Sequence, residues 1–252
     1  MTYLEGLLLA VIQGLTEFLP VSSSGHLVIV QSVLGVVQPG NEFEILVHIG
    51  TLMSVLVVFK NDILEILFDM RSKSTQKYIL YIIIGTVPAV FIGLGYKNFI
   101  ESLFNNLKTV GSALIFTGLV LFGSQFSVKR DLKLSIYTAF LIGCAQAIAI
   151  IPGISRSGMT ISMALILGFL PKHAARFSFL LAIPVISGAG ILTMIDLNED
   201  NYEFMLTGII GMFSSFLVGL FALKWLIGWL EKGKIYYFGI YCVLIGLLTL
   251  FS

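Results

Sequence analysis

The sequence has few charged residues and almost no cysteine. Only 12% of its 252 residues are Asp, Glu, Lys or Arg, whereas soluble domains carry about 25%. Hydrophobic residues make up 57%, and the mean hydropathy is +0.99. Cys144 and Cys242 lie in separate apolar segments without metal-ligand spacing, which argues against a disulfide framework and a zinc site. The composition predicts an integral membrane protein, and the net charge of +1 gives no reason to expect a nucleic-acid partner.

The apolar residues are grouped into membrane-length runs. No linker, low-complexity tract or signal peptide interrupts them, so we expect one membrane domain, 1–252. A helix needs roughly 20 residues to cross a bilayer. Six runs are about that long and are predicted to span the membrane: 42–60, 77–97, 108–126, 172–194, 203–225 and 234–251. Two further apolar pieces, 4–36 and 135–168, are each broken in the middle by Pro, Gly and Ser.

Basic residues concentrate in three of the predicted loops. Ten of the fifteen lie there: Lys60, Arg71, Lys73 and Lys77 in the first, Lys129, Arg130 and Lys133 in the second, Lys224, Lys232 and Lys234 in the third. Charged residues in the segment 196–203 are all acidic. An excess of Lys and Arg marks cytoplasmic loops, so with six spans both termini are predicted to lie outside.

A shift of 133 residues superimposes the two broken pieces. It pairs Gln13 with Gln146, Ser22 with Ser155, Ser24 with Ser157, and Gly25 with Gly158. We predict repeat 1 (about 1–126) and repeat 2 (about 135–252), each a broken pair followed by three spans, which inverts the second relative to the first. The fold expected is all-α, with about ten helical segments. Re-entrant hairpins at 4–19 with 24–36, and at 135–151 with 157–168, should meet at their tips, 20–26 and 152–158.

The two tips have the residues of an anion site. Pro20 and Pro152 are expected to end the preceding helices, and serines follow where N-caps belong. Each following helix then begins with free N–H groups and the positive end of its dipole. Gly25 and Gly158 would let the backbone approach a ligand, and Arg156 can bind a phosphate through two nitrogens. The predicted substrate-binding residues are Gln13, Ser22, Ser24, Gly25, Ser155, Ser157 and Gly158.

A carboxylate, a hydroxyl and an imidazole also lie close to the first tip: Glu17, Ser23 and His26. Anion binding alone would not need them, so they indicate nucleophilic phosphoryl chemistry on a lipid-borne phosphate. A structural ion pair between Glu17 and Arg156, and a structural role for His26, stay open as alternatives.

Other polar residues and another class of function were also weighed. His48 is interpreted as a packing or hydrogen-bonding residue. Glu44 is interpreted as a capping residue that could also reach the cavity. A secondary transporter or flippase for a prenyl phosphate or other anion is the alternative function, because such proteins often have inverted repeats.

The motifs resemble those of a known family. "QGLTEFLPVSSSGH" at 13–26 and "PGISRSGMT" at 152–160 are similar to the two signatures of bacitracin-resistance type undecaprenyl pyrophosphate phosphatases, and the similarity includes "FEILVHIGTL" at 43–52. The resemblance implies hydrolysis of a polyprenyl (undecaprenyl) diphosphate to the monophosphate, which recycles the carrier lipid for cell-wall glycan synthesis. It also implies a multi-pass protein of the plasma membrane, an active site open to the outer face, and Mg²⁺ or Ca²⁺. Membrane lipids are expected partners, and a homodimer is left open.

The resemblance assigns roles to four residues. Arg156 and the helix-start amides would hold the diphosphate, Ser23 would attack the terminal phosphorus, and His26, oriented by Glu17, would carry the proton. Exchange of the roles of Ser23 and His26, or direct attack by water, stays open.

The chain departs from the family pattern at two positions. Gln13 stands where a glutamate is common, and Ser24 where a threonine is common. This leaves Glu17 as the one carboxylate expected to bind the metal, together with diphosphate oxygens and water.

Overall fold

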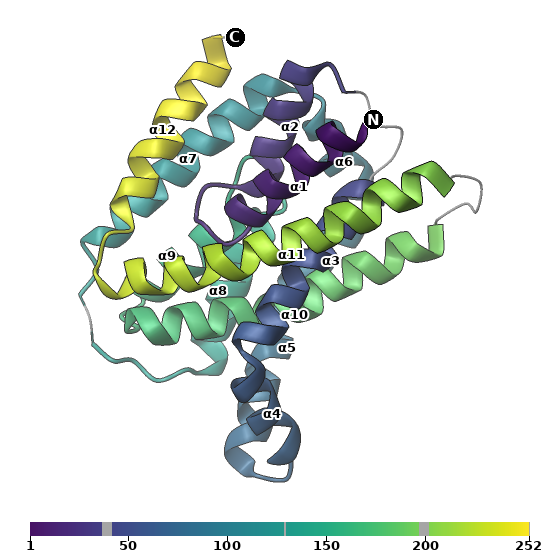
Figure 1. The fold of residues 1–252 in the computed structure, drawn as a ribbon. Helices are drawn as coiled ribbons and strands as arrows, with labels where there is room; N and C mark the ends of the chain where they lie inside the picture. The colour runs from purple at the N-terminus through teal and green to yellow at the C-terminus, as the bar shows by residue number, and fades with distance from the viewer. Residues whose placement is uncertain (37–41, 129, 197–201, 252) are drawn as a thin grey trace.

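The computed structural model describes residues 1–36, 42–128, 130–196 and 202–251, and within them the chain is all helical (Figure 1). The all-α membrane fold is thereby confirmed. The helices of the described residues are α1 Tyr3–Thr16, α2 Ser23–Leu34, α3 Glu42–Val58, α4 Lys60–Phe68, α5 Lys73–Gly95, α6 Lys97–Phe104, α7 Leu107–Gln125, α8 Ile136–Ile148, α9 Arg156–Ile166, α10 Pro171–Asp196, α11 Tyr202–Glu231 and α12 Tyr236–Phe251.

The six predicted spans coincide with α3, α5, α7, α10, α11 and α12. Four of these, α5, α7, α10 and α11, are long and apolar enough to cross a membrane unaided. Helix α3 qualifies only together with α4, and the pair is bent by 71°. With 16 residues, α12 extends over about 24 Å, less than the roughly 30 Å of a bilayer core.

Two short helices, α4 and α6, lie where the sequence predicted loops. Helix α4 projects below the rest of the molecule in Figure 1. Its Asp62 pairs with Arg176 of α10 at 2.5 Å. Helix α6 buries Ile100 and exposes Lys97 and Glu101. Three charged residues in α4 (Lys60, Asp62 and Glu65) and two in α6 (Lys97 and Glu101) concealed these helices, because the charge suggested solvated loops.

The two predicted hairpins are α1 with α2 and α8 with α9. Their first helices end at Thr16 and Ile148, three residues before the predicted ends. The reason is steric: a proline ring clashes with the helical carbonyl four residues earlier. Thr16 and Ile148 stand four residues before Pro20 and Pro152, so the helix ends there and not at the proline.

Close helix contacts hold the bundle together. A Cβ atom added to Gly118 of α7 would lie 2.7 Å from the carbonyl oxygen of Gly239 in α12, and Figure 1 shows these two helices side by side. Between α3 and α11, Ser54 Oγ donates to the carbonyl of Phe216 at 2.7 Å. Small residues that allow backbones to approach are typical of helix packing in membranes.

The helix order of the first half recurs in the second. A hairpin followed by three long helices is α1, α2, α3, α5 and α7 first, then α8, α9, α10, α11 and α12. Only α4 and α6 have no counterpart. The division into two repeats stays a prediction, to which this order adds a structural parallel.

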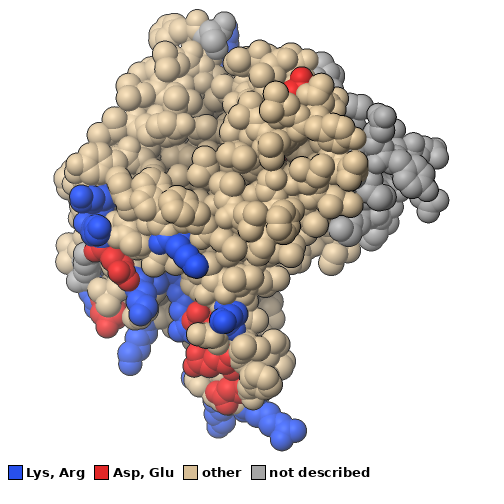
Figure 2. All heavy atoms as spheres, in the orientation of Figure 1, with Lys and Arg blue, Asp and Glu red and all other residues tan. Residues whose placement is uncertain are grey.

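Charge is distributed unevenly over the surface. Most Lys and Arg side chains visible in Figure 2 gather at the lower end, around the α4 projection. Both termini lie at the opposite, upper end in Figure 1. Lys129 and most of the acidic segment, 197–201, lie outside the described residues.

Candidate functional site

The two hairpin tips are in direct contact. Ser157 Oγ of the second tip donates to the carbonyl of Leu19 in the first at 3.3 Å. A Cβ added to Gly25 would lie 2.9 Å from Gly153 Cα, and one added to Gly158 would lie 3.3 Å from Pro20 Cβ. The sequence explained Gly25 and Gly158 by close approach to a ligand. In the structure the close approach is between the two tips, and the contact with a ligand stays a prediction.

Serines cap both inner helices, as predicted. Ser22 Oγ accepts from the amide of Gly25 at 3.3 Å, and Ser155 Oγ accepts from the amide of Gly158 at 3.1 Å. Ser22 has a φ of 67°, which is uncommon for a residue other than glycine and recurs at functional sites. Each cap satisfies the third amide of its helix. The first two amides lack an intrahelical partner, as at any helix start.

Helices α7 and α12 support the tips from behind. Thr117 Oγ1 of α7 donates to the carbonyl of Gly153 at 3.1 Å and accepts from the amide of Ser155 at 3.1 Å. Cys242 Sγ of α12 lies 3.5 Å from the carbonyl oxygen of Pro20. The irregular backbone of the tips therefore has polar partners inside the bundle, which an environment without water requires.

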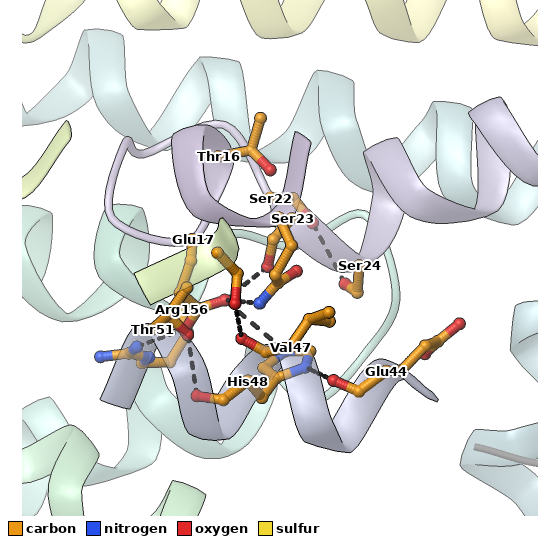
Figure 3. Close-up of polar contacts among 12 residues, drawn as sticks. Thr16, Glu17, Ser22, Ser23, Ser24, Glu44, Val47, His48, Thr51 and Arg156 are labelled. Carbon is orange, nitrogen blue, oxygen red and sulfur yellow. Dashed lines mark hydrogen bonds and ion pairs between the residues drawn. The ribbon is translucent and has the colours of Figure 1, made fainter. Parts of the chain in front are cut away.

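Glu17 is the centre of the site (Figure 3). Its Oε1 accepts from Arg156 Nη2 at 2.6 Å, and its Oε2 accepts from Ser23 Oγ at 2.6 Å and from Gln13 Nε2 at 3.1 Å. Arg156 comes from the opposite tip. The ion pair that the sequence left as an alternative is present, but it uses one guanidinium nitrogen, while Nη1 is buried and has no partner. A buried, unpaired donor beside a nucleophile-type hydroxyl is a binding position for an anion.

The sequence expected Glu17 to orient His26, and the structure corrects this. His26 Nδ1 donates to the carbonyl of Ser22 at 2.7 Å, and Nε2 accepts from the hydroxyl of Tyr241 at 2.8 Å. The tautomer follows because a carbonyl oxygen can only accept. Both ring nitrogens are occupied, and the ring stacks on Tyr241 at 5.5 Å.

The imidazole next to Glu17 is that of His48 in α3. Its Nε2 lies 3.6 Å from Glu17 Oε2, and its Nδ1 donates to the carbonyl of Glu44 at 2.6 Å. The sequence predicted a packing or hydrogen-bonding role for His48, and its bond to Glu44 agrees with that. Its position beside Glu17 was not predicted, since one histidine in an apolar helix carries no positional signal. Only the fold brings it to the site.

A cleft of about 180 Å³ lies over this cluster. Six of the predicted site residues line it: Glu17, Ser22, Ser23, Ser24, Ser155 and Arg156. Gln13, Gly25, His26, Ser157 and Gly158 do not, and Ser157 is fully buried. Gln146 lines the cleft with a buried Oε1 that has no partner. Its match with Gln13 in the repeat could have identified it.

The cleft continues into a wider outer space of about 700 Å³. His48, Phe104, Val185 and Ile186 line both spaces. The outer space also has two acidic side chains, Glu44 and Glu101. It provides the polar route from the cleft to the end of the bundle where α6 meets α7.

The side chains around Glu17 decide whether a divalent cation fits the site. In the described part of the chain, no three His, Cys, Asp or Glu side chains are grouped so that they could hold a metal. Mg²⁺ needs less, because it is usually bound by one or two carboxylates plus substrate phosphates and water. Glu17 lines the cleft and offers one such carboxylate. It fits a cation whose coordination the diphosphate and water would complete.

Comparisons with known proteins find relatives along nearly the whole chain. Residues 6–248 match the family model for "Bacitracin resistance protein BacA". The chain is 43% identical to an undecaprenyl-diphosphatase of Carboxydothermus hydrogenoformans, with 99% of this chain and 97% of that protein covered. It is 40% identical to one of Desulfosudis oleivorans (98% and 97% covered) and 38% identical to one of Korarchaeum cryptofilum (98% and 97% covered).

Proposed function

The chain belongs to the bacitracin resistance protein BacA family, and from that premise we propose that it hydrolyses undecaprenyl diphosphate to undecaprenyl phosphate and inorganic phosphate. The product is the carrier lipid that cell-wall glycan synthesis reuses. One observation carries the assignment: the Ser23 hydroxyl donates at 2.6 Å to a carboxylate that an arginine of the opposite tip holds in place. This is the geometry of an activated hydroxyl beside a phosphate-binding cation.

Arg156 and the starts of the inner helices bind the diphosphate in this proposal. Nη2 stays on Glu17, and Nη1 donates to a phosphate oxygen. The first amides of α9, at Arg156 and Ser157, and the dipole of that helix add to the positive potential. Because these groups are fixed by the fold, little reorganisation is needed as charge develops on the transferred phosphoryl group.

Ser23 is the proposed nucleophile, and Glu17 is its base. As Ser23 Oγ bonds to the terminal phosphorus, its proton passes to Glu17 Oε2, the bond to the bridging oxygen breaks, and Glu17 gives the proton to the departing undecaprenyl phosphate. Water then attacks the phosphoserine and gives a proton to the ionised Glu17, which returns it to Ser23 Oγ as phosphate leaves. His26 supports this step as a positioning residue, because it fixes the carbonyl of Ser22 next to the nucleophile.

The cation implied by the family would be held by Glu17, by diphosphate oxygens and by water. Mg²⁺ or Ca²⁺ bound there would offset the negative charge of the diphosphate. Neither ion would replace Arg156, because the guanidinium is already bonded to Oε1 of the Glu17 carboxylate.

We also propose an orientation. The cytoplasmic side is the basic end, and both termini and the outer opening of the cleft face the outside of the plasma membrane. The support is the gathering of Lys and Arg at one end and of the termini at the other (Figures 1 and 2). Cysteine at exposed Asn105 should react with a membrane-impermeant maleimide in intact cells, and cysteine at exposed Lys73 should not. The reverse pattern would invert the proposed topology.

Phosphate release from undecaprenyl diphosphate by the purified protein tests the function. The wild type should release phosphate, and Ser23→Ala should lose at least about 99% of the rate, since a nucleophile is removed. Ser112→Ala, which removes an exposed hydroxyl of α7, is the matched control and should be unaffected. Wild-type protein that moves prenyl phosphate across liposomes without releasing phosphate would instead identify a transporter. Full activity in Ser23→Ala would indicate direct attack by water.

A further inference from the structure

An apolar groove runs along the membrane face next to the cleft. We call it the α5–α8 groove, because helices α5, α6 and α8 form its walls. Its volume is about 680 Å³, and no charged side chain lines it. Residues that the argument uses are Pro88 of α5, Phe99 of α6, and Cys144 and Ile148 of α8.

The groove and the catalytic cleft share a border. Ile150 lines both of them. At two further places, neighbouring residues of the chain line the two spaces. Pro88 and Ile148 line the groove, while the residues that follow them, Ala89 and Ala149, line the cleft. A molecule with a charged head in the cleft can therefore extend an apolar tail into the groove past one side chain.

A second apolar groove, on the other side of α5, lacks this connection. It has about 640 Å³ and is lined by residues such as Ile83, Val90 and Pro184. None of its lining residues also lines the cleft. Apolar character alone does not distinguish the two grooves, since every lipid-facing surface is apolar. What distinguishes the α5–α8 groove is its shared border with the cleft.

We propose that the α5–α8 groove binds the isoprenoid chain of the substrate, beginning with the units nearest the diphosphate. This inference rests on the proposed function and adds the position of the tail. Lipid tails are as apolar as the groove, so burial itself contributes little driving force inside a bilayer. The groove acts by shape: it holds the first part of the chain in one direction, so that the diphosphate reaches Arg156 and Ser23 in line.

Groove-filling substitutions test the proposal. Cys144→Trp places a large ring in the α5–α8 groove, and Ile148→Trp does so from a position that is 45% exposed and tolerates a larger side chain. Each should lower kcat/KM for farnesyl diphosphate and for undecaprenyl diphosphate about tenfold, because the diphosphate is no longer held in line with Arg156 and Ser23. Ile83→Trp, in the second groove, is the matched control and should leave kcat/KM unchanged. Unchanged kcat/KM in both groove variants would overturn the proposal.

A second measurement does not depend on turnover. Farnesyl diphosphate with a photoreactive group on its terminal isoprene unit should label peptides of α5 and α8 that line the groove. Excess undecaprenyl phosphate should prevent the labelling. Labelling confined to the second groove, or spread evenly over the membrane face, would refute the assignment even where phosphate release is normal. Groove labelling by a wild-type protein that releases no phosphate would leave the tail site standing and reject the hydrolysis.

Discussion

Replacing Arg156 by lysine separates the two roles that the guanidinium combines. In the structure, Nη2 neutralises Glu17 at 2.6 Å, while Nη1 is buried without a partner. A lysine ammonium is a single point charge on a flexible chain. It can neutralise Glu17, but it cannot at the same time present a second, fixed nitrogen to a phosphate.

The size of the effect follows from the one contact that is lost. A hydrogen bond to a charged group contributes about 1.5–3 kcal/mol, so kcat/KM of Arg156→Lys should fall roughly 10- to 100-fold. Stability should change by less than about 1 kcal/mol, because the charge of Glu17 stays compensated. Arg156→Ala should abolish turnover and cost about 3–5 kcal/mol, because it leaves that buried carboxylate unpaired.

The assay measures kcat/KM for phosphate release and the thermal unfolding midpoint of the same detergent-purified samples. The double variant Glu17→Gln, Arg156→Gln is the control for charge. It should recover most of the stability lost in Arg156→Ala and none of the activity. Arg156→Lys with wild-type kcat/KM would show that the free nitrogen does not contact the substrate. Arg156→Lys as unstable as Arg156→Ala would refute the argument from charge compensation.

Three further changes probe the surroundings of the cluster. Gly25→Ala places a methyl group 2.9 Å from Gly153 Cα. It should destabilise the fold by about 1–3 kcal/mol and lower kcat. A wild-type melting curve would show that the tips can separate. Gln13→Glu places a second carboxylate beside Glu17 and should lower the Mg²⁺ concentration for half-maximal phosphate release several-fold. An unchanged or higher value would show that a side chain at position 13 does not reach the ion. Tyr241→Phe removes the hydroxyl that donates to His26 Nε2 at 2.8 Å. We expect a loss of about 1–3 kcal/mol in stability and a kcat within about tenfold of wild type. A larger loss of activity would give His26 a role in proton transfer.

The sequence predicted the helices well because membrane segments obey few rules. Each predicted span corresponds to one helix and each predicted hairpin to a pair of helices, since length and hydropathy determine which segments can lie in a membrane. The hairpin ends were three residues off, because the clash of Pro20 acts on Thr16, four residues back, and not on its immediate neighbour. Helices α4 and α6 were missed for another reason. Their charged residues resemble loop composition, and with nine and eight residues the two helices are too short to be recognised as spans.

The site was predictable where one segment supplies all its members. Glu17 and Ser23 lie six positions apart, and each tip has its own cap, so local spacing was enough. The contacts of His48 and Tyr241 were not predictable. Both depend on how distant helices are packed against the first tip, and a single sequence gives no register between helices. His26 was misassigned for the same reason: proximity to Glu17 in the chain was taken for proximity in space.

Charge balance explains why the site needs both tips. A lone carboxylate or guanidinium inside a membrane is costly, and the cost falls when the two are paired. Glu17 and Arg156 therefore stabilise each other only after the two hairpins have met, which couples assembly of the site to folding. Their charges cancel, so an incoming diphosphate finds one free guanidinium nitrogen and a set of amides for several negative charges. The divalent cation proposed above, entering with the substrate, would resolve that imbalance. Chelation should accordingly reduce turnover strongly while leaving the thermal unfolding midpoint of the substrate-free protein unchanged. A lowered midpoint would mean that the ion is part of the folded site and not a companion of the diphosphate.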